Sequence, residues 1–252
     1  MTGDFNSGIL NEVAHRPWPL PAGPWLMTQT WHDLLFAHWP VDPLLLRSRV
    51  PDVFPLDLFE GRAWVGVVPF QMTNVAPRGV PSLPWVSEFP ELNVRTYVTV
   101  DGKPGVFFFS LDAGSLLAVT TARTLLNLPY HVASMDVRPL GDGIGYKSVR
   151  SDGSGARFEA TYEGVGRAST PAAGTLEYFL TERYCLYQLG HTGAPYRMDI
   201  HHPPWPVQRA HAAIAVNTML DVHGLTPIDP SPLLHFAKRQ DMVAWAPSGL
   251  RS

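Results

Sequence analysis

The chain has 252 residues, of which 45% are hydrophobic, and it carries a net charge of −3 at pH 7. Lys and Arg together number 19 without forming a basic run, and no stretch of 18 apolar residues occurs, so neither a nucleic-acid-binding protein nor a membrane protein is expected. The N-terminus carries acids and lacks an apolar segment, and Cys185 is the sole cysteine. We therefore expect a cytoplasmic protein without a secretory signal, an intrachain disulfide or a cysteine-based zinc site.

The first part of the chain alternates proline-rich segments with short elements. Residues 1–24 form an irregular lead-in, because four prolines between 17 and 24 prevent regular structure. Residues 31–41 read as a mostly buried strand, and Asp42 followed by Pro43 marks the start of a short helix that stops at Pro51.

Two hairpins are predicted next. Residues 56–72 turn at Glu60-Gly61, and the second arm is apolar on both faces, which indicates a central strand. After a proline-rich loop over 76–90, residues 91–100 and 105–113 pair around Asp101-Gly102.

The rest of the chain mixes helices and strands. A helix is predicted over 115–126, ending at Asn127, and residues 175–187 begin as a helix and end as a strand. We read residues 206–224 as a helix because of their alanines, and residues 233–245 as a hairpin-like pair. Further strands are expected at 132–138, 144–150, 156–163 and 196–202.

These elements predict one domain over 25–252, of the α+β class, mainly β with two or three helices. No repeat or linker interrupts it, and the 25 prolines punctuate many short elements. The expected architecture is a strongly bent antiparallel sheet or barrel.

One strand carries an unusual polar face. In ELNVRTYV, residues 91–98, period-two alternation puts Glu91, Asn93, Arg95 and Tyr97 on one side and apolar residues and Thr96 on the other. Such a face is either solvated, as we expect for the alternating segment 156–163, or it lines a binding cavity.

Common catalytic motifs are absent. There is no GxGxxG, P-loop or GxSxG, and no HExxH accompanies the histidines at 201, 202 and 211. Adjacent His201 and His202 on a strand would point to opposite faces, so we expect no metal site, and no cofactor is implied. A metal enzyme using His201, His202 or His211 is the third reading of the sequence.

Several motifs in fixed order resemble the YqjF-like family of bacterial proteins of unassigned function. They are ELNVRTYV, GVFFFSLDA, AR, LPY, FLTERYCLY and IHHPPWPVQ, and the resemblance spans roughly residue 25 to the end. This family is remotely similar to acetoacetate decarboxylase. The resemblance implies a single barrel-like domain with a central cavity, in which the decarboxylase uses a lysine to form a Schiff base with its ketone substrate.

The lysine pair of the decarboxylase motif is missing here. Arg123 and Pro129 match that motif, but Tyr130 and His131 stand where its two lysines would be. Of the three lysines in the chain, only Lys147 falls in a plausible barrel strand, and its neighbours suggest an exposed position. The resemblance therefore implies the cavity without the Schiff-base chemistry.

The candidate site residues follow from the polar face and from this motif. We assign Glu91, Tyr130 and His131 to proton transfer, and Asn93, Arg95, Tyr97 and Arg123 to substrate binding. The resemblance leaves open whether Glu91 or Asn93 matches the family's catalytic glutamate. Alternatives stay open: Glu91 and Arg95 as an internal polar network, Arg123 paired with Asp112, Glu182-Arg183 as a salt bridge, and Trp205 and Cys185 as packing residues.

Two main readings of function remain. The first is a protein that binds a small, carboxylated organic molecule, with lyase- or hydratase-type acid/base chemistry. The second is a non-catalytic binder or sensor with the same fold. Long apolar strands and the assembly of related decarboxylases are compatible with a homodimer.

Overall fold

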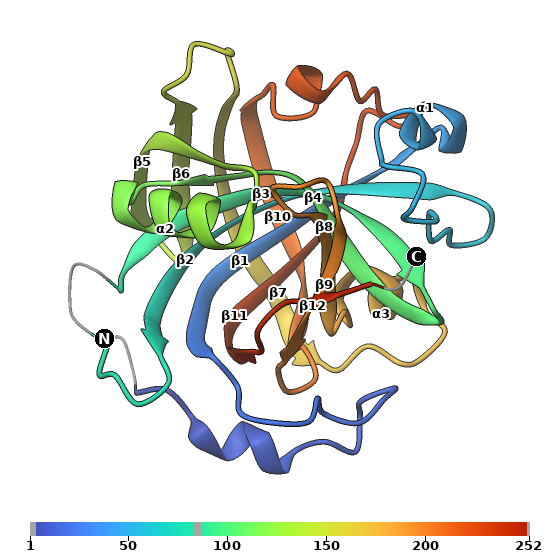
Figure 1. Cartoon of the computed structure of the whole chain (residues 1–252). Coiled ribbons are helices and arrows are strands. Elements are labelled where there is room, and N and C mark those ends of the chain that lie inside the picture. The colour runs from blue at the N-terminus through green and yellow to red at the C-terminus, as the bar shows by residue number, and fades with distance from the viewer. Residues whose placement is uncertain (1–3, 83–86, 251–252) are drawn as a thin grey trace.

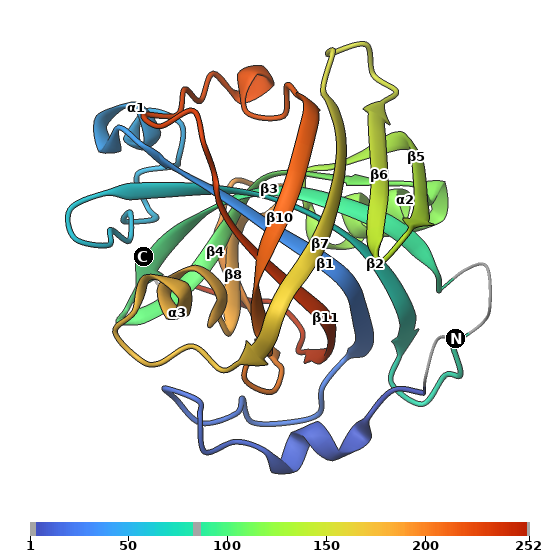
Figure 2. The same ribbon diagram turned by 180° about the vertical axis from the view of Figure 1, so that it is seen from behind.

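The structure is a computed structural model that describes residues 4–82 and 87–250. Across these residues, twelve strands form one sheet in the order β12-β9-β8-β4-β3-β2-β1-β11-β10-β7-β6-β5 (Figures 1 and 2). The strands are β1 (Met27–Val41), β2 (Ala63–Pro77), β3 (Phe89–Val100), β4 (Lys103–Ala113), β5 (Tyr130–Leu140), β6 (Gly143–Arg150), β7 (Arg157–Ser169), β8 (Cys185–Leu189), β9 (Pro195–His201), β10 (Val207–Asn217), β11 (Leu233–Ala244) and β12 (Ser248–Gly249). The helices are η1 (Ser7–Asn11), α1 (Pro43–Arg47), α2 (Leu116–Leu126), α3 (Leu176–Thr181) and η2 (Asp221–His223).

The sheet is strongly bent, and it curls back on itself twice. Two further pairings, β9 with β11 and β4 with β5, join strands that are not neighbours in this order. All neighbouring pairs are antiparallel except β4–β8, and the β4–β5 pairing is also parallel. The expected mainly β fold with a large bent sheet is confirmed, although the parallel pairings were not foreseen.

Both predicted hairpin turns are present. Asp101 and Gly102 have φ of 51° and 70°, and Glu60 and Gly61 have φ of 49° and 76°. Positive φ at both central residues gives a two-residue turn whose twist matches that of the flanking strands. The first turn joins β3 to β4. The Glu60-Gly61 turn precedes β2, and the residues before this turn pair only through isolated bridges.

The described parts of the predicted proline-rich loop agree with the expectation. The loop is shorter than expected because β2 continues to Pro77 and β3 begins at Phe89. Residues 78–82 and 87–88 form neither helix nor strand, and residues 83–86 lie outside the described residues.

The three α-helices begin at side-chain caps that the sequence indicates. Asp42, Ser115 and Thr175 each accept a hydrogen bond from a backbone amide of the first helical turn. Such a bond satisfies one of the amide groups that have no partner within the helix. At the other end of α2, Asn127 has φ of 50°, the left-handed conformation that ends the helix where predicted.

The helix predicted over 206–224 is wrong. Residues 207–217 form strand β10, which pairs antiparallel with β7. Exposure alternates along it, with Arg209 and His211 exposed and Ala210 and Ala212 partly buried against the core. Pairing with a neighbouring strand outweighs the helix propensity of the alanines.

The hairpin-like pair predicted over 233–245 is also wrong. Leu233–Ala244 is one continuous strand, β11, paired with β1 along most of its length. No turn interrupts its middle, where Arg239 and Gln240 stay in register with β1, opposite His32 and Trp31.

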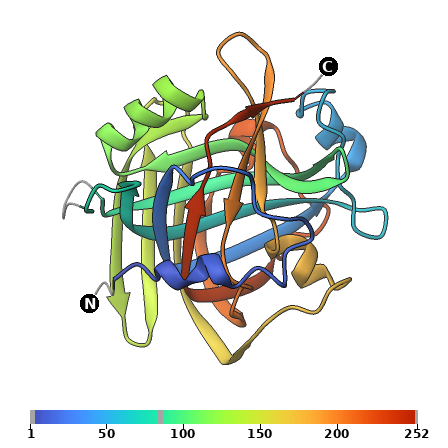
Figure 3. The ribbon, with the colours of Figure 1, turned by 60° about the horizontal axis from the view of Figure 1, so that its bottom comes forward.

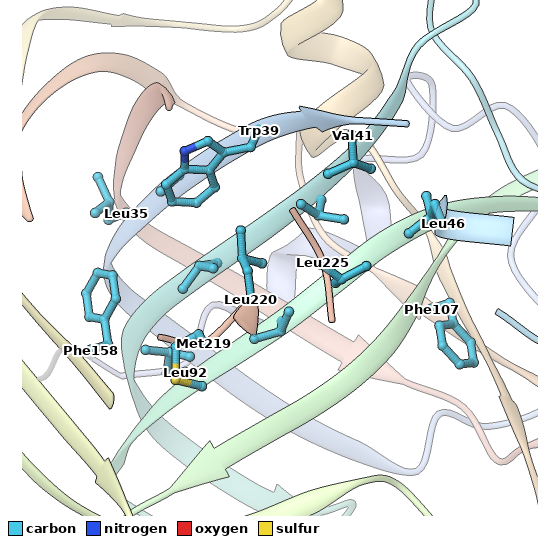
Figure 4. Packing of buried hydrophobic residues seen from close by; sticks show 14 of the residues in the cluster. Leu35, Trp39, Val41, Leu46, Leu92, Phe107, Phe158, Met219, Leu220 and Leu225 are labelled. Carbon is cyan, nitrogen blue, oxygen red and sulfur yellow. The ribbon is translucent and has the colours of Figure 1, made fainter. Parts of the chain in front are cut away.

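The wall formed by β1, β2, β3 and β4 separates two apolar clusters. Figure 4 shows part of the first, which includes Leu35 and Trp39 of β1 and Leu92 of β3. The second holds Leu34 and Phe36 of β1, the alternate positions on the same strand. Because both faces of the wall are buried, its strands read as nearly continuous apolar runs.

The N-terminal residues are part of the folded unit, although they carry no strand. Figure 3 shows this segment lying across the end of the bent sheet. Ile9 is fully buried against Val243 and Trp245, and the Arg16 guanidinium lies 4.7 Å from the Tyr184 ring centroid. Within 4–82 and 87–250, no helix has the length and apolar character needed to cross a membrane.

Candidate functional site

A cavity of about 530 Å³ lies against the face of β3 that the sequence singled out. Strands β1, β2, β4, β9 and β11 and helix α2 supply most of its walls, and most of the lining side chains are apolar. The volume falls in the range of small-molecule sites, which also combine an apolar lining with few polar groups.

Strand β3 places three of its four predicted polar residues in this cavity. Glu91, Asn93 and Arg95 all line it, since alternate residues of a strand share one face. Tyr97 is fully buried but is not part of the lining. Its hydroxyl donates to the Leu180 carbonyl at 2.8 Å and lies 2.6 Å from Nε2 of His38, so it is held within the protein.

Tyr130 reaches the same cavity and contacts Glu91. The Tyr130 hydroxyl donates a hydrogen bond of 2.6 Å to Oε2 of Glu91. Tyr130 comes to this place because β5 begins at Tyr130 and pairs in parallel with β4, opposite Leu111. Burial raises the pKa of the Tyr130 phenol well above its ordinary value, and the Glu91 carboxyl raises it further, so the phenol stays a donor.

Glu91 has a shifted pKa. Burial raises the pKa of its carboxyl to about 8, and nearby Asp112 adds to this, while hydrogen bonds from Tyr130 and Asn93 oppose it. Desolvation dominates because the side chain is only 2% exposed and burial disfavours the charged form. The carboxyl is therefore mainly protonated at neutral pH and can donate a hydrogen bond.

His131 does not face the cavity, contrary to the prediction. It follows Tyr130 in β5, and successive residues of a strand point to opposite faces. Its Nδ1 lies 3.0 Å from a carboxylate oxygen of Asp152. Burial and the nearby Arg150 lower the pKa of the His131 imidazole, and Asp112 and Asp152 act against them.

Arg123 also lies outside the cavity, contrary to the prediction. It is exposed on α2, whereas Ala118, Ala122 and Leu126 of the same helix line the cavity. Helical periodicity turns these three side chains inward and leaves Arg123 on another side. Asp112 pairs with buried Arg150 at 2.7 Å rather than with Arg123.

Arg95 is a cation without a carboxylate partner among the described residues. Its Nη2 donates to the Leu180 carbonyl at 3.2 Å, and its guanidinium lies 5.3 Å from the Phe36 ring centroid. Its Nε is buried and has no hydrogen-bond partner in the protein. A guanidinium in this setting suits a carboxylate that comes with a ligand.

The sequence analysis missed Arg183, Thr181 and His202 as lining residues. Arg183 pairs with Asp57 at 2.6 Å, not with Glu182, so the expected Glu182-Arg183 salt bridge is wrong. Glu182 instead accepts from the Trp205 amide at 2.8 Å and from the Tyr184 hydroxyl. The FLTERYCLY motif marked this segment, but only the fold shows which side chains turn inward.

The histidines considered for a metal are separated by the fold. His202 lines the cavity, with Nε2 at 3.1 Å from the Arg183 carbonyl, and burial lowers its pKa to about 4. His201 contacts Nη1 of Arg16 at 3.0 Å, and His211 is exposed on β10. Within the described part of the chain, no group of three or more His, Cys, Asp or Glu side chains is placed to hold a metal ion.

Trp205 combines packing with a place in the cavity wall. Its ring stacks on Trp31 with centroids 5.8 Å apart and meets Phe36 edge-on at 5.0 Å, so the expected packing role is confirmed. Its indole Nε1 is buried and has no hydrogen-bond partner in the protein, and the same is true of Oδ1 of Asn93. Buried polar atoms are nearly always paired, so these two atoms, with Nε of Arg95, indicate a polar ligand or water in this cavity.

None of the three lysines lines the cavity. Lys147 pairs with Glu159 at 3.1 Å, and Lys238 pairs with Asp33. The side chains of these two lysines are 48% and 73% exposed. Lys103 lies near the Trp18 ring, 5.8 Å from its centroid.

Comparisons with known proteins agree with this architecture. The chain is 49% identical over 226 residues to the uncharacterized protein YqjF of Bacillus subtilis strain 168, covering 90% of this chain and 93% of YqjF. The acetoacetate decarboxylase of Legionella pneumophila shares the fold, with a TM-score of 0.61 and 13% identity over 100% of this chain and 98% of that one. The enduracididine biosynthesis enzyme MppR complexed with pyruvate does so with a TM-score of 0.62 and 12% identity, over 94% and 93%.

The low identities to the acetoacetate decarboxylase and to MppR show the fold alone, whereas the match to YqjF and to a family profile shows the family. The profile, described as an uncharacterized conserved protein, matches residues 28–241. The chain belongs to this family, DUF2071, and has an acetoacetate decarboxylase-like fold.

Proposed function

We propose that this protein binds a small carboxylated organic molecule in the β3 cavity and acts on it by acid/base chemistry, without a Schiff base. The observation that carries the proposal is the Glu91–Tyr130 hydrogen bond in a cavity that is also lined by Arg95, a cation without a carboxylate partner among the described residues. A neutral acid and a cation on one cavity wall can hold a ligand that has a carbonyl oxygen and a carboxylate.

Each group has a defined task in this proposal. Arg95 pairs with the carboxylate of the ligand. Glu91, protonated because burial raises its pKa to about 8, donates to the carbonyl oxygen while Tyr130 holds the carboxyl in place. This donation stabilises negative charge that develops on the oxygen when the adjacent carbon gives up a proton to solvent water, and the enol so formed takes a proton back from water as Glu91 recovers its own. Proton loss beside a carbonyl is the first step of lyase and hydratase reactions.

An analogy of fold favours an oxo acid as ligand. The pyruvate complex of MppR and the acetoacetate decarboxylases have this fold, which is an analogy of fold and does not by itself settle function. The lysines of this chain lie outside the cavity, so a Schiff base is not part of the proposal.

A non-catalytic binder or sensor is the second candidate. One observation favours it: His131, expected as a proton-transfer group, faces away from the cavity, which leaves mainly apolar walls around few polar groups. Both candidates use Arg95 for binding, but only the first needs Glu91 to exchange protons with the ligand.

Calorimetric titration with pyruvate and acetoacetate tests binding, and NMR detection of solvent deuterium next to the ligand carbonyl tests proton transfer. We expect Arg95→Met to lose most of the affinity and Glu91→Gln to bind but not exchange. Arg123→Met, which removes an exposed arginine outside the cavity, serves as the matched control. Binding without exchange in the unaltered protein would favour the sensor, and equal binding by the Arg95 and Arg123 variants would refute the carboxylate site.

A further inference from the structure

Several polar groups of the cavity lie in a row along β3. Glu91, Asn93 and Arg95 follow one another on β3, and Tyr130 meets Glu91 directly. The remaining charged lining residue, Arg183, is already paired with Asp57. A ligand therefore finds its carboxylate and carbonyl partners along one strand of the cavity wall.

The wall beside Glu91 and Tyr130 is apolar and is formed by α2, which packs against β4 and β5 (Figure 1). Ala118 and Ala122, which are partly buried, and exposed Thr121 present small side chains to the cavity. Small residues at these places leave open space that leucine or phenylalanine would fill. No charged side chain of α2 lines the cavity.

The cavity reaches the protein surface beside α2. Leu117 and Leu125 both line the cavity, although 60% and 72% of their surfaces are exposed. Leu26, which also lines it, is 44% exposed. Side chains that touch both the cavity and solvent mark its mouth, and the rim of this mouth is aliphatic.

We infer that the ligand is an amphiphile: an oxo acid whose carboxylate and carbonyl lie at Arg95 and Glu91, and whose unbranched aliphatic chain runs toward the mouth beside α2. This inference rests on the proposed function and adds the class of ligand. The polar groups of the cavity suit the head group, with three unpaired buried polar atoms on Asn93, Arg95 and Trp205. The apolar walls and the leucine rim suit the chain.

The inference predicts that affinity depends on the length of the aliphatic chain of the ligand. Each methylene group moved from water into an apolar wall improves affinity by about fourfold. Calorimetric titration of the full chain with straight-chain 2-oxo acids, from pyruvate to 2-oxodecanoate, should show Kd falling by about this factor per added carbon. A second carboxylate at the far end, as in 2-oxodecanedioic acid, should cancel much of the gain, because no charged side chain of α2 lines the cavity.

Two variants of α2 form a matched pair. Ala122→Trp fills the space expected for the chain, so the long acids should bind no more tightly than pyruvate, while pyruvate keeps its affinity. Arg123→Trp adds the same ring at the next position, which is exposed and outside the lining, and should keep the dependence on chain length. Ala118→Leu is a smaller change on the inner side and serves if Ala122→Trp does not fold.

The outcomes separate this inference from the proposal on which it rests. If pyruvate and the long acids bind equally well, the chain site is refuted and the carboxylate site stands. If no 2-oxo acid of any length binds, the proposed function itself fails. If Ala122→Trp and Arg123→Trp both retain a steep dependence on chain length, the chain does not run beside α2.

Discussion

Glu91 is a carboxyl group placed where water cannot stabilise its charge. It is 2% exposed, its hydrogen bond from Tyr130 is 2.6 Å long, and burial outweighs that bond in setting its pKa. Catalytic acids in other proteins depend on the same balance, in which an apolar environment keeps a carboxyl neutral near pH 7.

The shifted pKa of Glu91 makes folding stability depend on pH. The pKa rises from 4.5, the ordinary value, to about 8 in the folded protein. Between these values the folded state binds more protons than the unfolded state, so the free energy of unfolding falls as pH rises, by at most about 1.4 kcal/mol per pH unit from this group. Glu91→Gln keeps an acceptor for Tyr130 and should remove this contribution.

Urea denaturation of the Glu91→Gln variant and the unaltered protein, between about pH 5 and about pH 9, measures the difference. The stability of the variant relative to the unaltered protein should grow across this window and level off above pH 8. Glu159→Gln, which alters a half-exposed carboxylate, is the control and should show no such growth. A constant difference for Glu91→Gln would mean that Glu91 is ionised throughout.

Helix α2 connects local sequence signals with the cavity. Ser115 caps its first turn, with Oγ accepting from the Ala118 amide at 3.3 Å, and Asn127 ends it in the left-handed conformation. Between these ends, only Val119 is fully buried. The helix is thus held weakly by packing, and its caps contribute a large share of its stability.

Ser115→Ala should loosen α2 by about 1 kcal/mol, because the Ala118 amide loses its partner. Hydrogen exchange of the α2 amides should become faster, while the exchange of β3 and β4 stays unchanged. Thr120→Ala removes a hydroxyl from the exposed side of the same helix, where it bonds only to the Leu116 carbonyl, and should not accelerate exchange. Equal effects of the two substitutions would show that the cap does not hold the helix.

At the scale of the element, the sequence predicted where strands and turns lie better than it predicted which strands pair with each other. The pair Asp101-Gly102 specifies its turn because both residues tolerate positive φ. β10 was misread because its alanines favour helix in isolation, and only the pairing with β7 makes it a strand. A local propensity therefore fails where a long-range partner provides the hydrogen bonds.

At the scale of the whole molecule, the bend of the sheet creates the cavity. The pairing of β9 with β11 brings the two sides of the sheet together, so side chains from β2, β3, β4, β9 and β11 surround one space. The N-terminal segment then covers the end of the bent sheet. Ile9 packs against Val243 of β11 and against Trp245, which follows the last residue of this strand.

The packing of the N-terminal segment can be tested without deleting it. Ile9→Ala should lower the free energy of unfolding by about 2–5 kcal/mol, since it empties a fully buried site. Val13→Ala shortens a side chain of the same segment that is 42% exposed, and it should cost less than about 0.5 kcal/mol. Urea denaturation measures both. A negligible loss for Ile9→Ala would mean that the N-terminal segment does not stabilise the sheet against which it packs.

The sequence by itself determined the class of fold, most elements and their ends, and the polar face of β3. These follow from local rules: alternation in strands, side-chain caps of helices, and turns that need positive φ. Within the site, this was enough to bring Glu91, Asn93 and Arg95 to the cavity, because one strand carries all three.

Only the tertiary structure decided which other side chains join them. Tyr130 and His131 are neighbours in the sequence, yet the start of β5 beside β4 turns one to Glu91 and the other to Asp152. Arg123, expected in the cavity, is exposed on α2, whereas Arg183, expected only in a salt bridge with Glu182, pairs with Asp57 and lines the cavity. The rotation of α2 and the path of the chain after α3, which depend on packing, decide both. The direction of a side chain relative to a cavity is a property of the assembled sheet, which local patterns do not encode.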